Sequence, residues 1–222
     1  MPRIARGLAD NHIYHVLNRG NNKQPIFLKR QDYEAFSILI EEAKKLYPIK
    51  LLAYCLMPNH FHMIVMPVLA EHLSNWMQWL MTSHVRRYNK HYNAVGHVWQ
   101  GRFKSFIIQN NEYLINAMRY VEANPVRAGL VGTAKDWAWS SHKETIGKIK
   151  PCLVDKAPIT LPADWGRYVD QNMGDKDLKE LRNCIQRQSP YGTLEWQSLI
   201  CESLGLESTL RPVGRPRKKL KK

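Results

Sequence analysis

The sequence predicts an α+β protein with a ferredoxin-like, split β-α-β antiparallel sheet and a small helical C-terminal extension. Apolar patterns typical of strands and helices follow one another in the order β-α-β-β-α-β-α over roughly the first 125 residues. Two of the strand patterns are separated only by Pro58-Asn59, a pair that suits the central positions of a tight turn. A hairpin placed between two helical crossovers is the split β-α-β plan.

The first elements are a strand, a helix and the two arms of this hairpin. Residues 12–20 alternate in polarity and are rich in strand-forming residues. Residues 31–47 carry apolar side chains at helical spacing and end before a proline, which predicts a helix. Residues 49–57 and 61–67 are apolar and short, and they predict the paired strands.

A long helix, a fourth strand and a further helix follow. Residues 70–92 repeat apolar positions every three or four residues and end in a basic cluster, which predicts an amphipathic helix. Residues 102–109 predict a strand, and residues 111–125 predict a helix that Pro125 closes.

The composition shifts toward Pro, Gly and Lys beyond about residue 145, which predicts a domain boundary. We expect a main domain over residues 1–148, a linker and small helical extension over 149–210, and a basic tail over 211–222. Within the extension, helical patterns occur near residues 175–188 and 193–204.

The charge balance points to a polyanionic partner. The chain has 222 residues, of which 44% are apolar, so it can bury a core. Lys and Arg outnumber Asp and Glu by 33 to 19, and the formal charge is +14. This balance favours nucleic acid as the partner, although ribosomal and membrane-surface proteins share it. The chain also contains seven Trp, more than a simple basic tail that only coats a polyanion would need.

Several other classes of protein are disfavoured. The four Cys include no C-x-x-C pair, which argues against a zinc ribbon or a dense disulfide scaffold and fits a reducing compartment. There is no run of about 18 apolar residues and no signal-peptide core, so we expect a cytoplasmic protein without a membrane partner. No G-x-x-x-x-G-K-[ST] loop is present, so we expect no nucleotide cofactor.

His60 and His62 are the first pair of residues able to carry chemistry. They lie two positions apart in a strand and therefore project from one face, while Phe61 projects from the other. Two imidazoles on one face can clamp a metal ion. Alternatively, both lie on a solvated edge or form hydrogen bonds in the core, and the pair alone does not decide between these interpretations.

The helix predicted over residues 111–125 offers a nucleophile and a third ligand. Tyr120 and Asn124 are one turn apart on one face, and an Asn carbonyl oxygen suits a hard divalent ion. Asn116 is the rival ligand and Tyr113 the rival nucleophile. Alternatively, Tyr120 is a core aromatic residue and Asn124 merely caps the helix.

Four ordered segments carry a family resemblance: MPNHFHMIV, GHVWQGRFKSFII, RYVEANPVRAGLV and DWAWSSH. Together they are similar to the REP-associated tyrosine transposases, which are bacterial single-tyrosine HUH transposases of the IS200-like family. The resemblance covers roughly residues 10–145. Four motifs in order are far more specific than a histidine pair, and residues 1–148 are then the HUH single-tyrosine transposase domain.

The resemblance implies a site and a reaction. By position, His60 and His62 are the HUH metal ligands, Asn124 is the third ligand and Tyr120 is the catalytic nucleophile that attacks a DNA phosphodiester. The implied cofactor is a divalent ion, Mg²⁺ or Mn²⁺. Cleavage yields a 5′-phosphotyrosine and a free 3′-hydroxyl, so rejoining needs no ATP. The group that accepts the tyrosine proton is not evident, because Glu122 points off the Tyr120 face.

The expected partner is single-stranded or hairpin DNA of repeat elements. Five basic residues are expected to meet its phosphates: Arg86, Arg87, Lys90, Arg102 and Lys104. Tyr88, Trp99 and Phe103 are candidates for stacking on unpaired bases. The alternatives are a solvated face for each cation and core packing for Trp99 and Phe103.

The basic tail contains VGRPRKK, which resembles an AT-hook whose Arg215 and Arg217 enter a narrow minor groove. A solvated tail is the alternative. DNA contacts of this kind imply a nucleoid-associated protein of the bacterial cytoplasm. The sequence leaves open whether the protein is a monomer or a homodimer.

Two rival functions share these features. One is a hairpin-binding DNA regulator that does not cut, which would not require all of His60, His62, Tyr120 and Asn124. The other is a rolling-circle replication initiator, for which a helicase or a paired tyrosine would be expected. Tyr113 lies about 10 Å from Tyr120 along the predicted helix.

Overall fold

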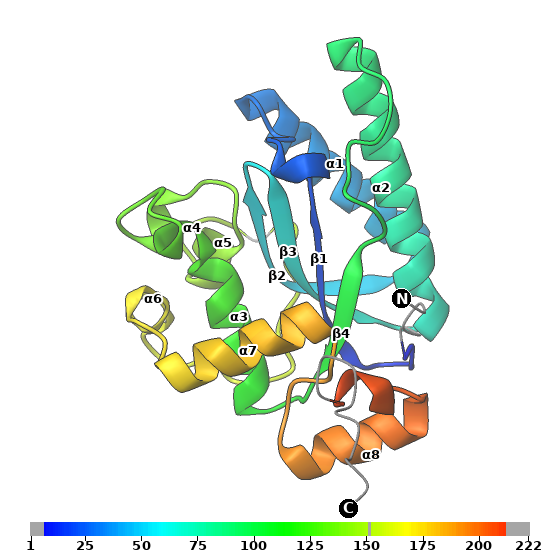
Figure 1. The fold of residues 1–222 in the computed structure, drawn as a ribbon. Coiled ribbons are helices and arrows are strands. Elements are labelled where there is room, and N and C mark those ends of the chain that lie inside the picture. The colour runs from blue at the N-terminus through cyan, green and yellow to red at the C-terminus, as the bar shows by residue number, and fades with distance from the viewer. Residues whose placement is uncertain (1–6, 151, 212–222) are drawn as a thin grey trace, which may run out of the picture.

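The computed structural model describes residues 7–150 and 152–211, and its centre is a four-stranded sheet (Figure 1). The strand order is β2-β3-β1-β4, and every neighbouring pair is antiparallel. This order and direction are those of the predicted split β-α-β sheet, so the fold class is confirmed. The strands are β1 (Ile13–Arg19), β2 (Ile49–Met57), β3 (His60–Pro67) and β4 (Lys104–Ile108).

The helices lie on both faces of the sheet (Figure 1). Helices α1 (Arg30–Leu46) and α2 (Ala70–Tyr92) pack on one face and contact each other. Helix α3 (Glu112–Glu122) covers the other face and contacts β2, β3 and β4. The predicted order β-α-β-β-α-β-α is therefore confirmed, and the bounds of α2 agree with the prediction at both ends.

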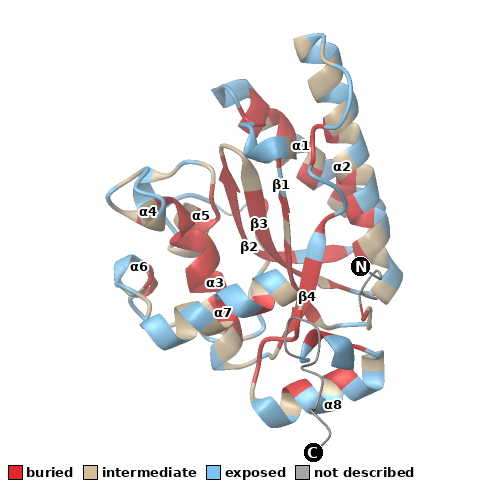
Figure 2. Cartoon of the chain, in the orientation of Figure 1, coloured by how far each residue is buried: buried red, intermediate tan, exposed pale blue. Residues whose placement is uncertain are grey.

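Alternation along the strands builds two hydrophobic cores, and the strands are almost entirely buried (Figure 2). On β3, Phe61 and Met63 belong to the core beneath α1 and α2, whereas Ile64 belongs to the core beneath α3. Because side chains alternate between faces, His62 lies on the α3 side. The turn at Pro58-Asn59 joins Met57 to His60 in register, as predicted.

Five further helices follow α3, and the segment that carries the last three of them packs against both cores. Trp165, Leu181 and Cys184 enter the core beneath α3, while Cys201 and Leu206 enter the other core. The predictions near residues 175–188 and 193–204 are confirmed by α7 and α8, and the domain boundary at residue 148 stays a prediction. The helices are α4 (Asn124–Arg127), α5 (His142–Thr145), α6 (Trp165–Asp170), α7 (Asp175–Arg187) and α8 (Leu194–Leu204). Three short 3-10 turns complete the described elements: Asn21–Lys23, Ala134–Asp136 and Glu207–Thr209.

The prediction that Pro125 closes a helix over residues 111–125 is wrong. Helix α3 ends at Glu122, and Pro125 lies in the first turn of α4. Proline has no N–H to continue the hydrogen bonds of α3, but its fixed φ suits the first turn of a new helix. The extra turn carries Arg127 back toward Tyr120.

Among the described residues, no helix is both long enough and apolar enough to cross a membrane.

Candidate functional site

His60 and His62 lie on one wall of a cavity at the edge where β3 begins. The cavity has a volume of about 600 Å³, and its other walls come from β1, the segment that leads into β4, β4 itself, α3, α4 and α7. In the β1–β3 pairing, His60 is opposite Arg19 and His62 is opposite Leu17. The lining residues are Leu17, Asn18, Arg19, His60, His62, Gln100, Arg102, Lys104, Tyr120, Asn124 and Ile185.

Each histidine uses its Nδ1 atom in a hydrogen bond within the protein. His60 Nδ1 is 2.7 Å from Asn59 Oδ1, and His62 Nδ1 is 2.7 Å from His15 Nε2. Burial lowers the pKa of His60 to about 4 and holds the pKa of His62 well below its usual value, with nearby cations such as Arg19 acting in the same direction. Both rings are therefore neutral at pH 7, and their Nε2 atoms are left for a ligand.

The last turn of α3 brings Tyr120 against this histidine pair. The Tyr120 and His62 ring centres are 5.8 Å apart at an interplanar angle of 84°. The guanidinium of Arg127 covers Tyr120, with Cζ 3.9 Å from the ring centre. Asn124 follows on the same side of the cavity, where it is buried and its Nδ2 atom has no hydrogen-bond partner.

These side chains fit a divalent ion only as a mixed donor set. Within residues 7–150 and 152–211, no group of three or more His, Cys, Asp or Glu side chains is placed to hold a metal ion. His60 and His62 offer two imidazole nitrogens, and Asn124, which lines the same cavity, offers its amide oxygen. Imidazole and amide oxygen are both accepted by Mn²⁺ and related ions, so the donor chemistry fits.

The two rival candidates face away from the cavity. Tyr113 packs edge-on against Tyr191, with ring centres 4.8 Å apart. Asn116 Oδ1 accepts a hydrogen bond of 3.4 Å from the Tyr168 hydroxyl. Neither residue lines the cavity that holds the histidine pair.

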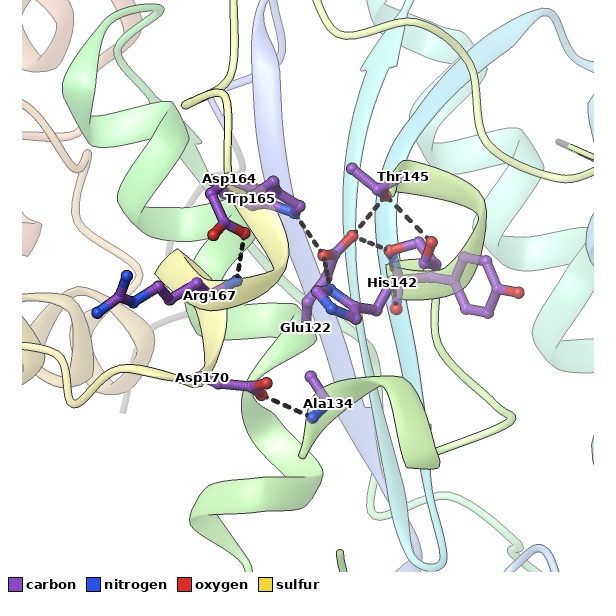
Figure 3. Close-up of polar contacts among 10 residues, drawn as sticks. Glu122, Ala134, His142, Thr145, Asp164, Trp165, Arg167 and Asp170 are labelled. Carbon is purple, nitrogen blue, oxygen red and sulfur yellow. Dashed lines mark hydrogen bonds and ion pairs between the residues drawn. The ribbon is translucent and has the colours of Figure 1, made fainter. Parts of the chain in front are cut away.

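Glu122 points away from Tyr120, as predicted, and is the centre of a buried polar cluster (Figure 3). Its carboxylate accepts hydrogen bonds from Ser141 Oγ at 2.6 Å, and from Thr145 Oγ1 and Trp165 Nε1, both at 2.7 Å. His142 Nδ1 lies 2.7 Å from Oε2 of the same carboxylate. The cluster ties the end of α3 to α5 and α6, which immobilises the helix that carries Tyr120.

The predicted DNA-contacting cations fall into two groups. Arg102 and Lys104 are exposed and line the cavity of the histidine pair. Arg86, Arg87 and Lys90 are exposed on α2, which covers the opposite face of the sheet. Arg102 also borders a second cavity, of about 580 Å³, together with Arg86.

The aromatic residues considered for base stacking lie in or against the core. Trp99 and Phe103 are 5% and 8% exposed and belong to the core beneath α1 and α2, which agrees with the core-packing alternative. Tyr88 is half-buried and packs against Tyr92, with ring centres 4.8 Å apart. Arg215 and Arg217 lie outside the described residues.

Two residues of the site, His15 and Arg127, are not predicted from the sequence. His15 is fully buried on β1 and meets His62 through the pairing of two strands that are far apart in the sequence. Arg127 lies seven residues after Tyr120, close to two helical turns, but the break at Ala123 hides that relationship. The one sequence signal is that His15, like His60 and His62, falls in or beside a predicted strand; the pairing of β1 with β3 places it beside His62.

Comparisons with known proteins identify the family of the chain. Residues 9–124 match the family described as Transposase IS200 like. A Haemophilus influenzae protein named as a REP-associated tyrosine transposase is 31% identical over 144 residues, covering 60% of this chain and 72% of that protein. An Escherichia coli REP-associated tyrosine transposase is 25% identical over 166 residues, covering 73% of this chain and 90% of its own.

A solved structure has the same fold. It is a REP-associated tyrosine transposase bound to a REP hairpin, with a TM-score of 0.54 and 20% identity. The match covers 73% of this chain and 100% of the other.

Proposed function

Because the chain belongs to the IS200-like transposase family, we propose that it cleaves and rejoins single-stranded, hairpin-forming DNA through a 5′-phosphotyrosine intermediate. The repeat-element hairpin is taken as substrate because a structural relative is bound to a REP hairpin. The protein is then an endonuclease and strand transferase that acts on DNA in the bacterial cytoplasm.

The observation that carries this proposal is the contact between Tyr120 and the histidine pair. Tyr120 is the tyrosine of α3 that shares a cavity with His60 and His62, whereas Tyr113 packs elsewhere. A tyrosine of this kind attacks a phosphodiester at phosphorus. Its oxygen bonds to phosphorus and loses its proton, while the P–O3′ bond breaks and the 3′ oxygen gains a proton.

His60, His62 and Asn124 would hold a divalent ion, Mg²⁺ or Mn²⁺, beside the phosphate. When bound, such an ion polarises the scissile phosphate and offsets the charge that develops on it. The protein's own groups position the other reactants. Arg102 and Lys104 supply positive charge to the cavity wall where a DNA strand enters, and Arg127 and the Glu122 cluster hold the nucleophile in place.

The test is to mix the purified full chain with end-labelled single-stranded hairpin DNAs and Mn²⁺ and to separate the products on a denaturing gel. We expect a protein-linked label that disappears in Tyr120→Phe and persists in Tyr113→Phe. Hairpin binding without ions should be equal in all three proteins. Tight binding without any linked label, across hairpins and ions, would instead indicate a DNA regulator that does not cut.

A further inference from the structure

His15 and His62 form a hydrogen-bonded pair inside the sheet. The distance from His15 Nε2 to His62 Nδ1 is 2.7 Å, and the two side chains are 0% and 5% exposed. They come from β1 and β3, which pair with each other. Both side chains face α3, where each ring lies near the ring of Tyr120. Both rings are buried, and His15 packs against Phe106, a surrounding that disfavours a charged imidazolium.

A hydrogen bond between two neutral imidazoles allows two proton arrangements. In the first, His62 donates from Nδ1–H to a bare His15 Nε2, and His62 Nε2 carries a lone pair. In the second, His15 donates from Nε2–H, and the proton of His62 is on its Nε2 atom. Only the first arrangement lets His62 act as a ligand through Nε2.

The surroundings favour the first arrangement. The cavity wall beside His62 carries Arg19, Arg102 and Lys104, and no Asp or Glu among the described residues lines it. A bare His62 Nε2 can accept hydrogen bonds from these cationic side chains. An N–H at the same atom would face positive charge and would have no carboxylate to accept its hydrogen bond. His15 Nδ1 then carries the proton. That atom is buried without a hydrogen-bond partner, and its ring packs against Phe106 at a centre distance of 4.9 Å, an environment in which N–H groups interact weakly with aromatic faces.

We propose that His15 is a positioning residue that accepts the Nδ1–H of His62 and so keeps His62 Nε2 free to bind the divalent ion. The role of His62 as a metal ligand rests on the proposed function, but the tautomer of His62 is a property of the protein alone. Partners of metal-ligating histidines are usually carboxylates or carbonyl groups, which can only accept. A histidine in this place can also donate, so a measurement of the protonated nitrogen distinguishes the two arrangements.

The first measurement is a long-range ¹H–¹⁵N spectrum of the full-length protein labelled at histidine nitrogen and free of metal. The His62 signal is assigned by its loss in His62→Gln. The expected result is a protonated Nδ1 and a bare Nε2 on His62. A protonated Nε2 on His62 would overturn the proposal.

The second measurement is Mn²⁺ affinity without DNA, determined by calorimetry. His15→Phe removes the acceptor and keeps an aromatic ring, and we expect it to weaken Mn²⁺ binding by about 10- to 100-fold. His15→Gln restores an acceptor oxygen and should recover most of the affinity. His84→Phe is the matched control, because His84 is a buried histidine in the core on the opposite face, and its substitution should leave Mn²⁺ binding unchanged.

The outcomes separate this inference from the proposed function. Equal Mn²⁺ affinity in wild type and His15→Phe would contradict a positioning role for His15. A wild-type protein that binds no Mn²⁺ would contradict the ion site, and the spectrum would still decide the tautomer. If His15→Phe does not fold, the wild-type spectrum and His15→Gln carry the test.

Discussion

The guanidinium of Arg127 lies over the ring of Tyr120, with its Cζ atom 3.9 Å from the ring centre. Its Nη1 atom also donates a hydrogen bond of 2.8 Å to the Tyr120 carbonyl oxygen. Within the described part of the chain, no carboxylate forms an ion pair with Arg127. Burial lowers the pKa of this guanidinium. An unneutralised cation therefore rests on the ring expected to attack DNA.

Removing this cation should slow the attack. We expect Arg127→Met to reduce the single-turnover rate of protein–DNA linkage by about 5- to 30-fold. The cation favours the negative charge that grows on Tyr120 as its hydroxyl loses its proton, and a desolvated contact of this kind contributes roughly 1–2 kcal/mol. Arg127→Lys keeps the charge but loses the guanidinium, and its rate should lie between those of the wild type and Arg127→Met. The rates are measured with saturating hairpin DNA. Arg30→Met, at an exposed arginine of α1, is the control, and an unchanged rate in Arg127→Met would contradict a role in the reaction.

Truncating Glu122 should destabilise the fold strongly. Glu122→Ala removes the acceptor of the buried Trp165 Nε1 and His142 Nδ1 groups. It also removes one of the two acceptors of the Ser141 and Thr145 hydroxyls. We expect the free energy of unfolding, measured in urea, to fall by about 3–5 kcal/mol. Glu202→Ala, at an exposed position of α8, should change it by less than about 0.5 kcal/mol. A small effect at Glu122 would show that the cluster is dispensable for stability.

The buried histidines should make the protein sensitive to acid. Burial lowers the pKa of His84 to about 4, whereas a histidine in the unfolded chain titrates near ~6.5. Between these values the unfolded chain binds more protons, so the free energy of unfolding falls as the pH falls. His84→Phe should flatten this dependence by up to roughly 1.4 kcal/mol per pH unit.

Urea unfolding of both proteins at pH 7, 6 and 5 provides the measurement. His91→Gln, at an exposed position on α2, is the control and should keep the wild-type dependence. His15 and His60 have the same direction of pKa shift, so part of the acid sensitivity should persist in His84→Phe. An identical slope in wild type and His84→Phe would contradict the lowered pKa of His84.

Charge on the cavity wall should set part of the salt dependence of DNA binding. We expect Arg102→Ala with Lys104→Ala to reduce the slope of log affinity against log salt by about 1.4, since each single-strand phosphate contact contributes roughly 0.7. The affinities are measured by fluorescence anisotropy with a labelled hairpin and without divalent ions. Arg30→Ala should keep the wild-type slope, and an unchanged slope in the double variant would place the DNA elsewhere on the surface.

Local patterns account for most of the fold that the sequence predicted. The helix over residues 70–92 and the hairpin around Pro58-Asn59 depend on neighbours a few positions apart, and both agree with the structure. The break between α3 and α4 was missed, because Pro125 is compatible with either ending one helix or beginning the next. The short helices α5 and α6 were also not predicted, because a segment of four to six residues is too short to show helical periodicity.

Strand and helix spacing in the sequence predicts the sheet and the order of its elements. The motifs that resemble the transposase family select His60, His62, Tyr120 and Asn124 as the candidate set. The tertiary structure decided which tyrosine meets the histidines and what surrounds them. Strand pairing places His15 beside His62, and the turn after α3 places Arg127 over Tyr120. The helices that cover the sheet separate Arg102, at the cavity, from Arg87 on α2. Such contacts join residues distant in the chain, and no local periodicity encodes them.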